Sequence, residues 1–178
     1  MHILAISGSL RLQSSNTTLL RAVAMLAPEG VTNTIYDGLG DLPHFNPDLE
    51  GSEPPSVLNF RALLVAADGV LISSPEYAHG VPGVLKNALD WVVGSGELVN
   101  KPVALLNPSP RSTYAQASLI ETLTVMMGYL VTEASQTVPL AGKKLDEAGI
   151  VAHPEIGTML QAAIRAFVHA IHAQNSSS

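Results

Sequence analysis

Two stretches of this sequence gather residue types that bind small molecules. Residues 7–17 read Ser-Gly-Ser-Leu-Arg-Leu-Gln-Ser-Ser-Asn-Thr, and residues 73–83 read Ser-Ser-Pro-Glu-Tyr-Ala-His-Gly-Val-Pro-Gly. The first stretch has small hydroxyl side chains and an arginine before a predicted helix, where free backbone N–H groups favour an anion such as a phosphate. The second has an aromatic residue in a proline-stiffened backbone, which suits a flat ring. Together, a phosphate site and a ring site indicate flavin mononucleotide (FMN) as the ligand.

The pattern of the whole chain predicts how these stretches are positioned. Apolar runs predict strands, and apolar residues at helical spacing predict helices between them. The expected strands cover residues 3–6, 32–36, 69–72, 102–106 and 129–132, and the expected helices cover residues 16–26, 57–67, 82–93, 115–127 and 156–171. Such alternation indicates an α/β protein with a parallel sheet. For five strands we predict a flavodoxin-like three-layer sandwich of strand order 2-1-3-4-5, in which the ligand crevice lies between strands 1 and 3. The two stretches follow those two strands.

The composition is that of one globular domain without thiol chemistry. The 178 residues are 47% hydrophobic and 13% charged, which favours a single flavodoxin-like, FMN-binding domain over residues 1–174, with a mobile tail over 175–178. There is no cysteine, so disulfides, thiolate nucleophiles and iron–sulfur clusters are excluded. Any redox chemistry must therefore come from a bound cofactor.

The charge and the apolar segments give no sign of a nucleic-acid or membrane partner. The formal net charge is −6, and the longest basic run is Lys143-Lys144. Residues 1–6 lack the basic region and long apolar stretch of a signal peptide, and no apolar segment is long enough to span a bilayer. We therefore expect a cytoplasmic protein that acts on small molecules.

Several side chains of the first stretch are suited to holding a phosphate. The hydroxyl groups belong to Ser9, Ser14, Ser15 and Thr17. Arg11 offers a guanidinium that can pair with a phosphate through two hydrogen bonds, and Asn16 can cap the following helix. The alternative is that the Ser-Ser-Asn segment only caps the helix and that Arg11 is solvated. Neither G-x-G-x-x-G nor G-x-x-x-x-G-K-[ST] occurs, which argues against classical dinucleotide binding and P-loop nucleotide hydrolysis.

Two groups of titratable residues do not predict catalysis or metal binding. Glu76, Tyr77 and His79 lie close in sequence, but nothing pairs them with a nucleophile. Hydride transfer through a flavin needs no protein acid or base, so we predict no catalytic side chain. His169 and His172 lie one helical turn apart, but without a third ligand they do not predict a metal site.

Three motifs resemble those of a known family. They are Gly8-Ser9-Leu10-Arg11 with Ser14 or Ser15 and Asn16, the segment from Leu42-Pro43 to Asp48-Leu49-Glu50, and the segment from Pro75-Glu76-Tyr77 to Ala88-Leu89-Asp90-Trp91. In these residues, which cover 3–93 closely, the chain resembles the NADPH-dependent FMN reductases of flavodoxin-like fold. That family includes azoreductases, quinone reductases and chromate reductases.

The resemblance implies a cofactor, a reaction and a set of contacts. The FMN phosphate would be bound by Ser9, Arg11, Ser15, Asn16 and Thr17, and the ring would be bordered by Pro75, Glu76, Tyr77 and His79. The family's reaction is ping-pong: NADPH or NADH reduces the FMN, and a flavin, a quinone or a similar planar acceptor then enters the same cleft. Members form homodimers or homotetramers through the helix that corresponds to 82–93. Trp91 on that helix is either a core residue or an interface anchor.

Residues 107–114, Asn-Pro-Ser-Pro-Arg-Ser-Thr-Tyr, depart from the family pattern. The family has a small glycine-rich loop near the flavin ring at this position, whereas this loop has two prolines and no glycine. Such a loop offers fewer backbone N–H donors and cannot approach the ring as closely. Ser109 and Arg111 are still candidate cofactor-binding residues. Arg111 either meets the phosphates of NADPH or is solvated.

Two other classes of function stay open at this point. A flavodoxin-type electron carrier would hold FMN but act on partner proteins, although the first stretch lacks the Thr-x-Thr-Gly-x-Thr pattern of flavodoxins. A regulatory protein that has lost the flavin would account for the unusual loop at 107–114. The sequence does not decide the physiological acceptor, the choice between NADPH and NADH, or the choice between dimer and tetramer.

Overall fold

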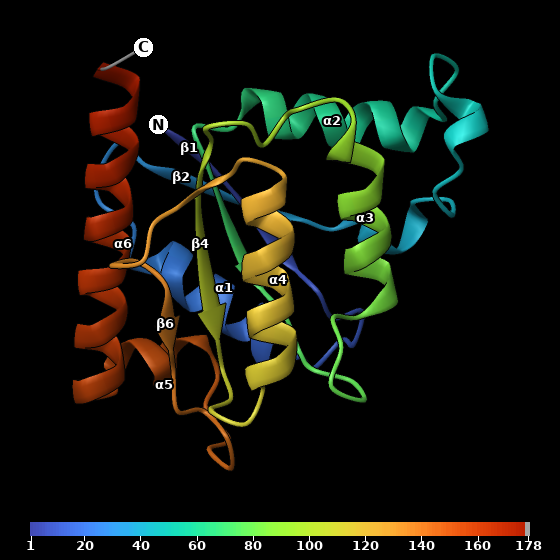
Figure 1. Cartoon of the computed structure of the whole chain (residues 1–178). Coiled ribbons are helices and arrows are strands. Elements are labelled where there is room, and N and C mark those ends of the chain that lie inside the picture. The colour runs from blue at the N-terminus through green and yellow to red at the C-terminus, as the bar shows by residue number, and fades with distance from the viewer. Residues whose placement is uncertain (177–178) are drawn as a thin grey trace.

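A computed structural model describes residues 1–176 as a sheet covered by helices on both faces (Figure 1). The sheet has the strand order β2-β1-β3-β4-β5, and its described strand pairs are parallel. The strands are β1 (His2–Ser7), β2 (Thr32–Tyr36), β3 (Gly69–Ser73), β4 (Pro102–Asn107), β5 (Tyr129–Leu130) and β6 (Gln136–Thr137). The helices are α1 (Ser15–Met25), α2 (Pro55–Ala66), α3 (Gly83–Val93), α4 (Thr113–Val125), α5 (Glu147–Ala152) and α6 (Pro154–Ser176), with short 3-10 helices at Gly38–Asp41 and Pro47–Leu49. The predicted flavodoxin-like fold and strand order are confirmed.

The three central strands are buried on both faces, as their continuous apolar runs predict. Every residue of β3 and β4 is buried, and so are the last five residues of β1. The register pairs Ile3 with Gly69 and Ser7 with Ser73, so β1 and β3 end side by side. The loops that follow these strands therefore start at the same edge of the sheet. In open α/β sheets this is the switch point where ligands bind.

Two hydrophobic cores, one on each face of the sheet, hold the helices in place. On one face, α2, α3 and α4 bury side chains such as Phe60, Leu85 and Leu119. On the other face, α1, α5 and α6 bury side chains such as Leu20 and Phe167. The cores fix the directions of α1, α3 and α4, whose N-termini lie at the carboxyl edge of the sheet, the lower edge in Figure 1.

The structure differs from the sequence prediction mainly after residue 129. The strand predicted over 129–132 is only the two-residue β5, and a second short strand, β6, pairs with the end of β4. Helix α5 was not predicted, and α6 runs to Ser176, so the first half of the predicted tail is helical. Residues 177–178 lie outside the described residues. Pro82 is the N-cap of α3 rather than a residue of its first turn.

Trp91 belongs to the core of the subunit. Only 5% of its surface is exposed, and its indole Nε1 donates a hydrogen bond to the carbonyl oxygen of Pro43 at 2.8 Å. Its ring also meets Phe45 edge to face, with 5.2 Å between the ring centroids. Of the two interpretations of Trp91, the structure supports the core residue.

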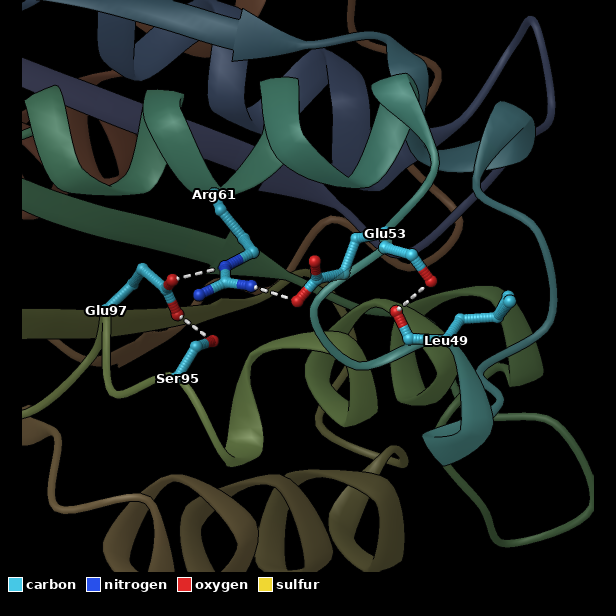
Figure 2. Close-up of polar contacts among 6 residues, drawn as sticks. Leu49, Glu53, Arg61, Ser95 and Glu97 are labelled. Atoms are coloured by element: carbon cyan, nitrogen blue, oxygen red, sulfur yellow. Dashed lines mark hydrogen bonds and ion pairs between the residues drawn. The ribbon is translucent and has the colours of Figure 1, made fainter.

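An ion-pair network ties the long segment before α2 to the connection after α3 (Figure 2). The guanidinium of Arg61 donates from Nη1 to Glu53 at 2.8 Å and from Nε to Glu97 at 2.6 Å. The Glu97 side chain is only 5% exposed, and it also accepts a hydrogen bond from the Ser95 hydroxyl. Backbone N–H groups of Glu53 and Gly51, together with Arg61, hold the pKa of the Glu53 carboxyl below its usual value. The Glu53 carboxylate is therefore kept charged beside Arg61.

Neither a membrane-spanning helix nor a metal-binding cluster occurs among residues 1–176. Within residues 1–176, no helix is both long enough and apolar enough to cross a bilayer. In the same part of the chain, no three His, Cys, Asp or Glu residues lie close enough together to hold a metal ion. His169 and His172 are exposed on α6.

Candidate active site

Three loops meet at the carboxyl edge of the sheet. Loop 1 (residues 8–14) joins β1 to α1, loop 2 (74–82) joins β3 to α3, and loop 3 (108–112) joins β4 to α4. Loops 1 and 2 are in direct contact, because Gly8 N donates to Ser73 O at 2.8 Å. A Cβ atom at Gly8 would lie 2.8 Å from Ser74 Oγ. Glycine at this position therefore lets the two loops pack closely.

The N-terminus of α1 presents an unpartnered hydroxyl group. Ser14 is the N-cap, and its side chain makes no capping hydrogen bond. The Ser14 Oγ atom is buried and has no hydrogen-bond partner, which is rare for a buried polar atom. No acidic side chain lies in the first turn of α1 to compensate the helix dipole. This helix end is therefore suited to an anion.

The other polar residues of this region are held by protein contacts. Asn16, which the sequence predicts as a cap or phosphate contact, accepts a hydrogen bond at Oδ1 from the buried Ser73 hydroxyl at 3.0 Å. The Thr17 hydroxyl donates to Ser7 Oγ at 2.8 Å. Ser9 is buried, and its Oγ accepts from the Arg11 backbone N–H at 3.4 Å. These bonds shape loop 1 and tie α1 to the end of β3.

Loop 2 contains a tight turn without glycine at its centre. Tyr77 and Gly80 exchange two backbone hydrogen bonds, at 3.1 and 2.9 Å. The residues between them, Ala78 and His79, have φ values of 49° and 61°. Such a turn usually contains asparagine or glycine, because other side chains are strained at positive φ. Strain of this kind persists only where the surroundings hold it.

Two contacts fasten loop 2 to the first turn of α4. The Glu76 carboxylate accepts a hydrogen bond at Oε2 from the backbone N–H of Ala115 at 2.9 Å, and so satisfies one of the free N–H groups of the helix. The His79 ring stacks on the Tyr114 ring, with 4.1 Å between centroids and 15° between planes. Glu76 and His79 thus attach loop 2 to the first turn of α4.

An apolar cleft of about 450 Å³ lies between loops 1 and 2. Its lining residues are Gly8, Leu10, Arg11, Tyr77, Pro82, Gly83 and Val84. Ligand pockets in proteins are typically a few hundred cubic ångströms, mainly apolar, with a few polar groups that orient the ligand. Arg11 also borders a second cavity of about 220 Å³, which Ser7, Ser9 and Thr17 line as well. Arg11 therefore lies between an apolar slot and a hydroxyl-rich hollow.

Loop 3 is held by its own side chains. The buried Asn107 side chain donates to Ser112 O at 3.1 Å and accepts from Ser109 N at 3.0 Å. The Ser109 hydroxyl accepts from the Arg111 backbone N–H at 3.3 Å. Neither Ser109 nor Arg111 lines the two cavities described above. Asparagine and serine thus supply the turn that glycines would otherwise make.

Tyr36 lines the second cavity and titrates abnormally. Burial, with Asp41 and Asp37 nearby, raises the pKa of Tyr36 to about 12. In the unfolded chain the Tyr36 hydroxyl ionises at about pH 10, whereas in the folded chain it stays protonated to higher pH. Raising the pH above 10 therefore favours the unfolded state. The contribution of this group to stability is complete below about pH 10 and is lost as the pH rises towards 12.

We expect the free energy of unfolding to fall across this pH interval, and to fall less in Tyr36→Phe. Urea unfolding at a series of alkaline pH values measures it. The same fall in both proteins would contradict the assignment to Tyr36.

The comparisons with known proteins agree with this architecture. FerB, a flavoenzyme NAD(P)H:(acceptor) oxidoreductase from Paracoccus denitrificans, superposes with a TM-score of 0.87 at 30% identity, over 97% of this chain and 98% of that one. The sequence profile of the NADPH-dependent FMN reductases matches residues 1–142. The chain belongs to this FMN reductase family.

Among curated FMN reductase relatives, an NAD(P)H-dependent FMN reductase of Pseudomonas aeruginosa is 31% identical over 170 residues, which are 92% of this chain and 91% of that protein. A probable NADPH:quinone oxidoreductase of Oryza sativa subsp. japonica is 45% identical over 95 residues, and a 2-hydroxy-1,4-benzoquinone reductase of a Burkholderia species is 38% identical over 112. The last two matches span 47% and 61% of those proteins. The family is thus shown along most of the chain, whereas similarity to the quinone reductases covers only part of it.

The residues of the site fit the FMN of this reductase family. A phosphate at the N-terminus of α1 would give the buried Ser14 hydroxyl its missing partner and meet the guanidinium of Arg11. A flat ring suits the apolar slot of Leu10, Tyr77 and Val84. Both Ser14 and Ser15 are hydroxyl candidates in the sequence, and the structure adds that Ser14 is buried and unpartnered whereas Ser15 is exposed.

Proposed function

We propose that the protein is an NAD(P)H oxidoreductase that passes reducing equivalents from NADPH or NADH, through FMN bound at loops 1 and 2, to flavins, quinones or similar planar acceptors. The observation that carries the proposal is the unpartnered Ser14 hydroxyl at the N-terminus of α1, at the end of the loop that lines an apolar cleft, in a chain of the FMN reductase family. The quinone reductases among its relatives support a quinone as acceptor.

The chain's own groups bind and orient rather than react. Bound FMN would supply the two-electron chemistry, so no side chain needs to act as acid or base. Arg11, Ser9 and Ser14 would hold the phosphate, with the first N–H groups of α1. Leu10 and Val84 would cover the ring and exclude water. One cleft would serve donor and acceptor in turn, which is the geometry of a ping-pong reaction.

Spectroscopy of the purified protein tests this function. We expect the protein to take up FMN, NADPH to bleach the bound flavin under anaerobic conditions, and a quinone to restore the colour. A flavin that only dithionite or a separate reductase can reduce would instead favour the electron carrier. A protein that binds no FMN would favour the regulatory alternative.

We further propose that the enzyme acts in the cytoplasm, which supplies reduced nicotinamide nucleotides, and that it acts as a homodimer or homotetramer. Helix α4 and the residues after it expose several apolar side chains, namely Ile120, Val125, Met127 and Tyr129. Surface helices normally place such side chains inward, so their exposure supports a contact between copies. Sedimentation of the purified protein tests the assembly, and a monomer would contradict it.

A further inference from the structure

The stacked rings of His79 and Tyr114 lie on the surface rather than in a core. Tyr114 is 58% exposed, His79 is exposed as well, and neither ring belongs to the two hydrophobic cores. Because the rings face each other at 4.1 Å, their exposure comes from their outer faces and edges. An exposed, ordered pair of rings offers a face on which a further planar group can stack.

The chain holds this pair in place at an energetic cost. His79 keeps a φ of 61° in a turn where glycine would be unstrained. The Glu76 bond to Ala115 fixes the same loop to the same helix turn, so both rings are carried by one joined unit. Strained backbone in a structure collects at functional sites, where the strained side chain is needed. A surface on which a ligand stacks would require the His79 ring in this position and would account for the strain.

The position of the pair limits what can bind to it. Hydride transfer requires the reacting ring to meet the flavin, and the proposed ring site is the cleft that Tyr77 lines. His79 and Tyr114 do not line that cleft, although only the strained turn separates His79 from Tyr77. A ligand of the ring pair is therefore a non-reacting part of a substrate whose other end reaches the cleft. A simple quinone has one planar group, whereas a nicotinamide dinucleotide has two, joined by phosphates.

Loop 3, which leads into the helix turn that carries Tyr114, also carries a cation suited to those phosphates. Arg111 precedes Tyr114 by three residues and is exposed, and its guanidinium forms no ion pair with any residue in 1–176. Arg21 and Arg61 are paired with carboxylates, whereas Arg11 and Arg165, like Arg111, form no ion pair within residues 1–176. An unpaired arginine in the loop that leads to an exposed ring pair suits a planar and phosphate-bearing ligand.

We propose that His79 and Tyr114 form a stacking subsite for the adenine of NAD(P)H, and that Arg111 binds the phosphates of its adenosine half. The proposal rests on the proposed function, because it assigns the non-reacting half of the electron donor. It also gives loop 3 a role: the loop places Arg111 outside the flavin cleft instead of approaching the ring.

Calorimetric titration of the FMN-loaded protein with adenosine 2′,5′-bisphosphate tests the subsite without turnover. We expect Tyr114→Ala to weaken this ligand about tenfold, as for other bases stacked on aromatic side chains. Tyr114→Phe should bind like the parent, since it keeps the ring. Arg111→Gln should weaken the bisphosphate about tenfold and AMP less, because AMP has one phosphate fewer. Nicotinamide mononucleotide should bind equally to all variants.

A control variant keeps the test specific. Arg165→Gln removes an exposed arginine of α6 and should bind like the parent. If the bisphosphate does not bind the FMN-loaded parent, or binds Tyr114→Ala as tightly, the subsite is wrong. If instead the parent takes up no FMN, it is the proposed function that fails.

Discussion

The variant Arg11→Ala is expected to bind FMN about 1.5–3 kcal/mol more weakly, while its affinity for riboflavin stays nearly unchanged. The guanidinium of Arg11 borders the hydroxyl-rich hollow at the start of α1, so its loss removes a charged contact to a phosphate that riboflavin lacks. Titration of the apoprotein with each flavin, followed by flavin fluorescence, measures both affinities. Equal losses for the two ligands would place Arg11 away from the phosphate.

Ser14→Ala provides a companion to this test. A buried hydroxyl without a partner contributes nothing favourable to the apoprotein, so its removal should leave the free energy of unfolding unchanged or raise it. The same change should weaken FMN but not riboflavin, because the hydroxyl would donate to the phosphate. Ser15→Ala, at an exposed position one residue later, is the matched control. Loss of stability without loss of FMN affinity would show that Ser14 has a structural role.

Arg61→Ala is expected to cost about 3 kcal/mol of stability, close to the lower end for a broken buried ion pair. The variant leaves Glu97, whose side chain is 5% exposed, without its cation (Figure 2). Arg21→Ala is the control: its pair with Glu147 is exposed and longer, at 3.3 Å, so its loss should cost at most about 1 kcal/mol. Urea denaturation of both variants and the parent gives the two differences.

Adding Glu97→Gln to Arg61→Ala should restore part of the stability. Glutamine has nearly the same size as glutamate, so the change removes the unpaired charge without leaving a cavity. FMN affinity should be retained in both proteins, since the network is distant from loops 1 and 2. Equal costs for Arg61→Ala and Arg21→Ala would contradict the role assigned to the network.

The sequence predicts the fold well because the fold depends on local patterns. The apolar run at 69–72 is a strand buried on both faces, and the periodic residues between 156 and 171 form a helix, whatever lies elsewhere in the chain. The short strand Gln136–Thr137 has no such pattern, since two polar residues form a strand only because the end of β4 is available to pair with them. Prediction therefore fails where pairing, not periodicity, makes the element.

The sequence predicts which loops form the site, but it does not predict the contacts that their side chains make. Asparagine is a common helix cap, but the Asn16 side chain accepts a hydrogen bond from Ser73, 57 residues away. Glu76 looks like a ring contact in sequence, and in the structure its carboxylate caps the first turn of α4. Such partners are set by tertiary packing, which the spacing of residue types does not encode. Only burial distinguishes Ser14 from Ser15.

Beyond β4, the sheet ends in two short strands, β5 and β6, instead of one continuous edge strand. This arrangement affects how the sheet can pair with strands of other molecules. Each piece pairs with only two residues of β4, at opposite ends of that strand. An uninterrupted edge strand is a template for extending the sheet with a strand from another molecule, and hence for aggregation. Two staggered fragments present too few aligned backbone groups for that. This side of the sheet is thereby protected against fibrous association.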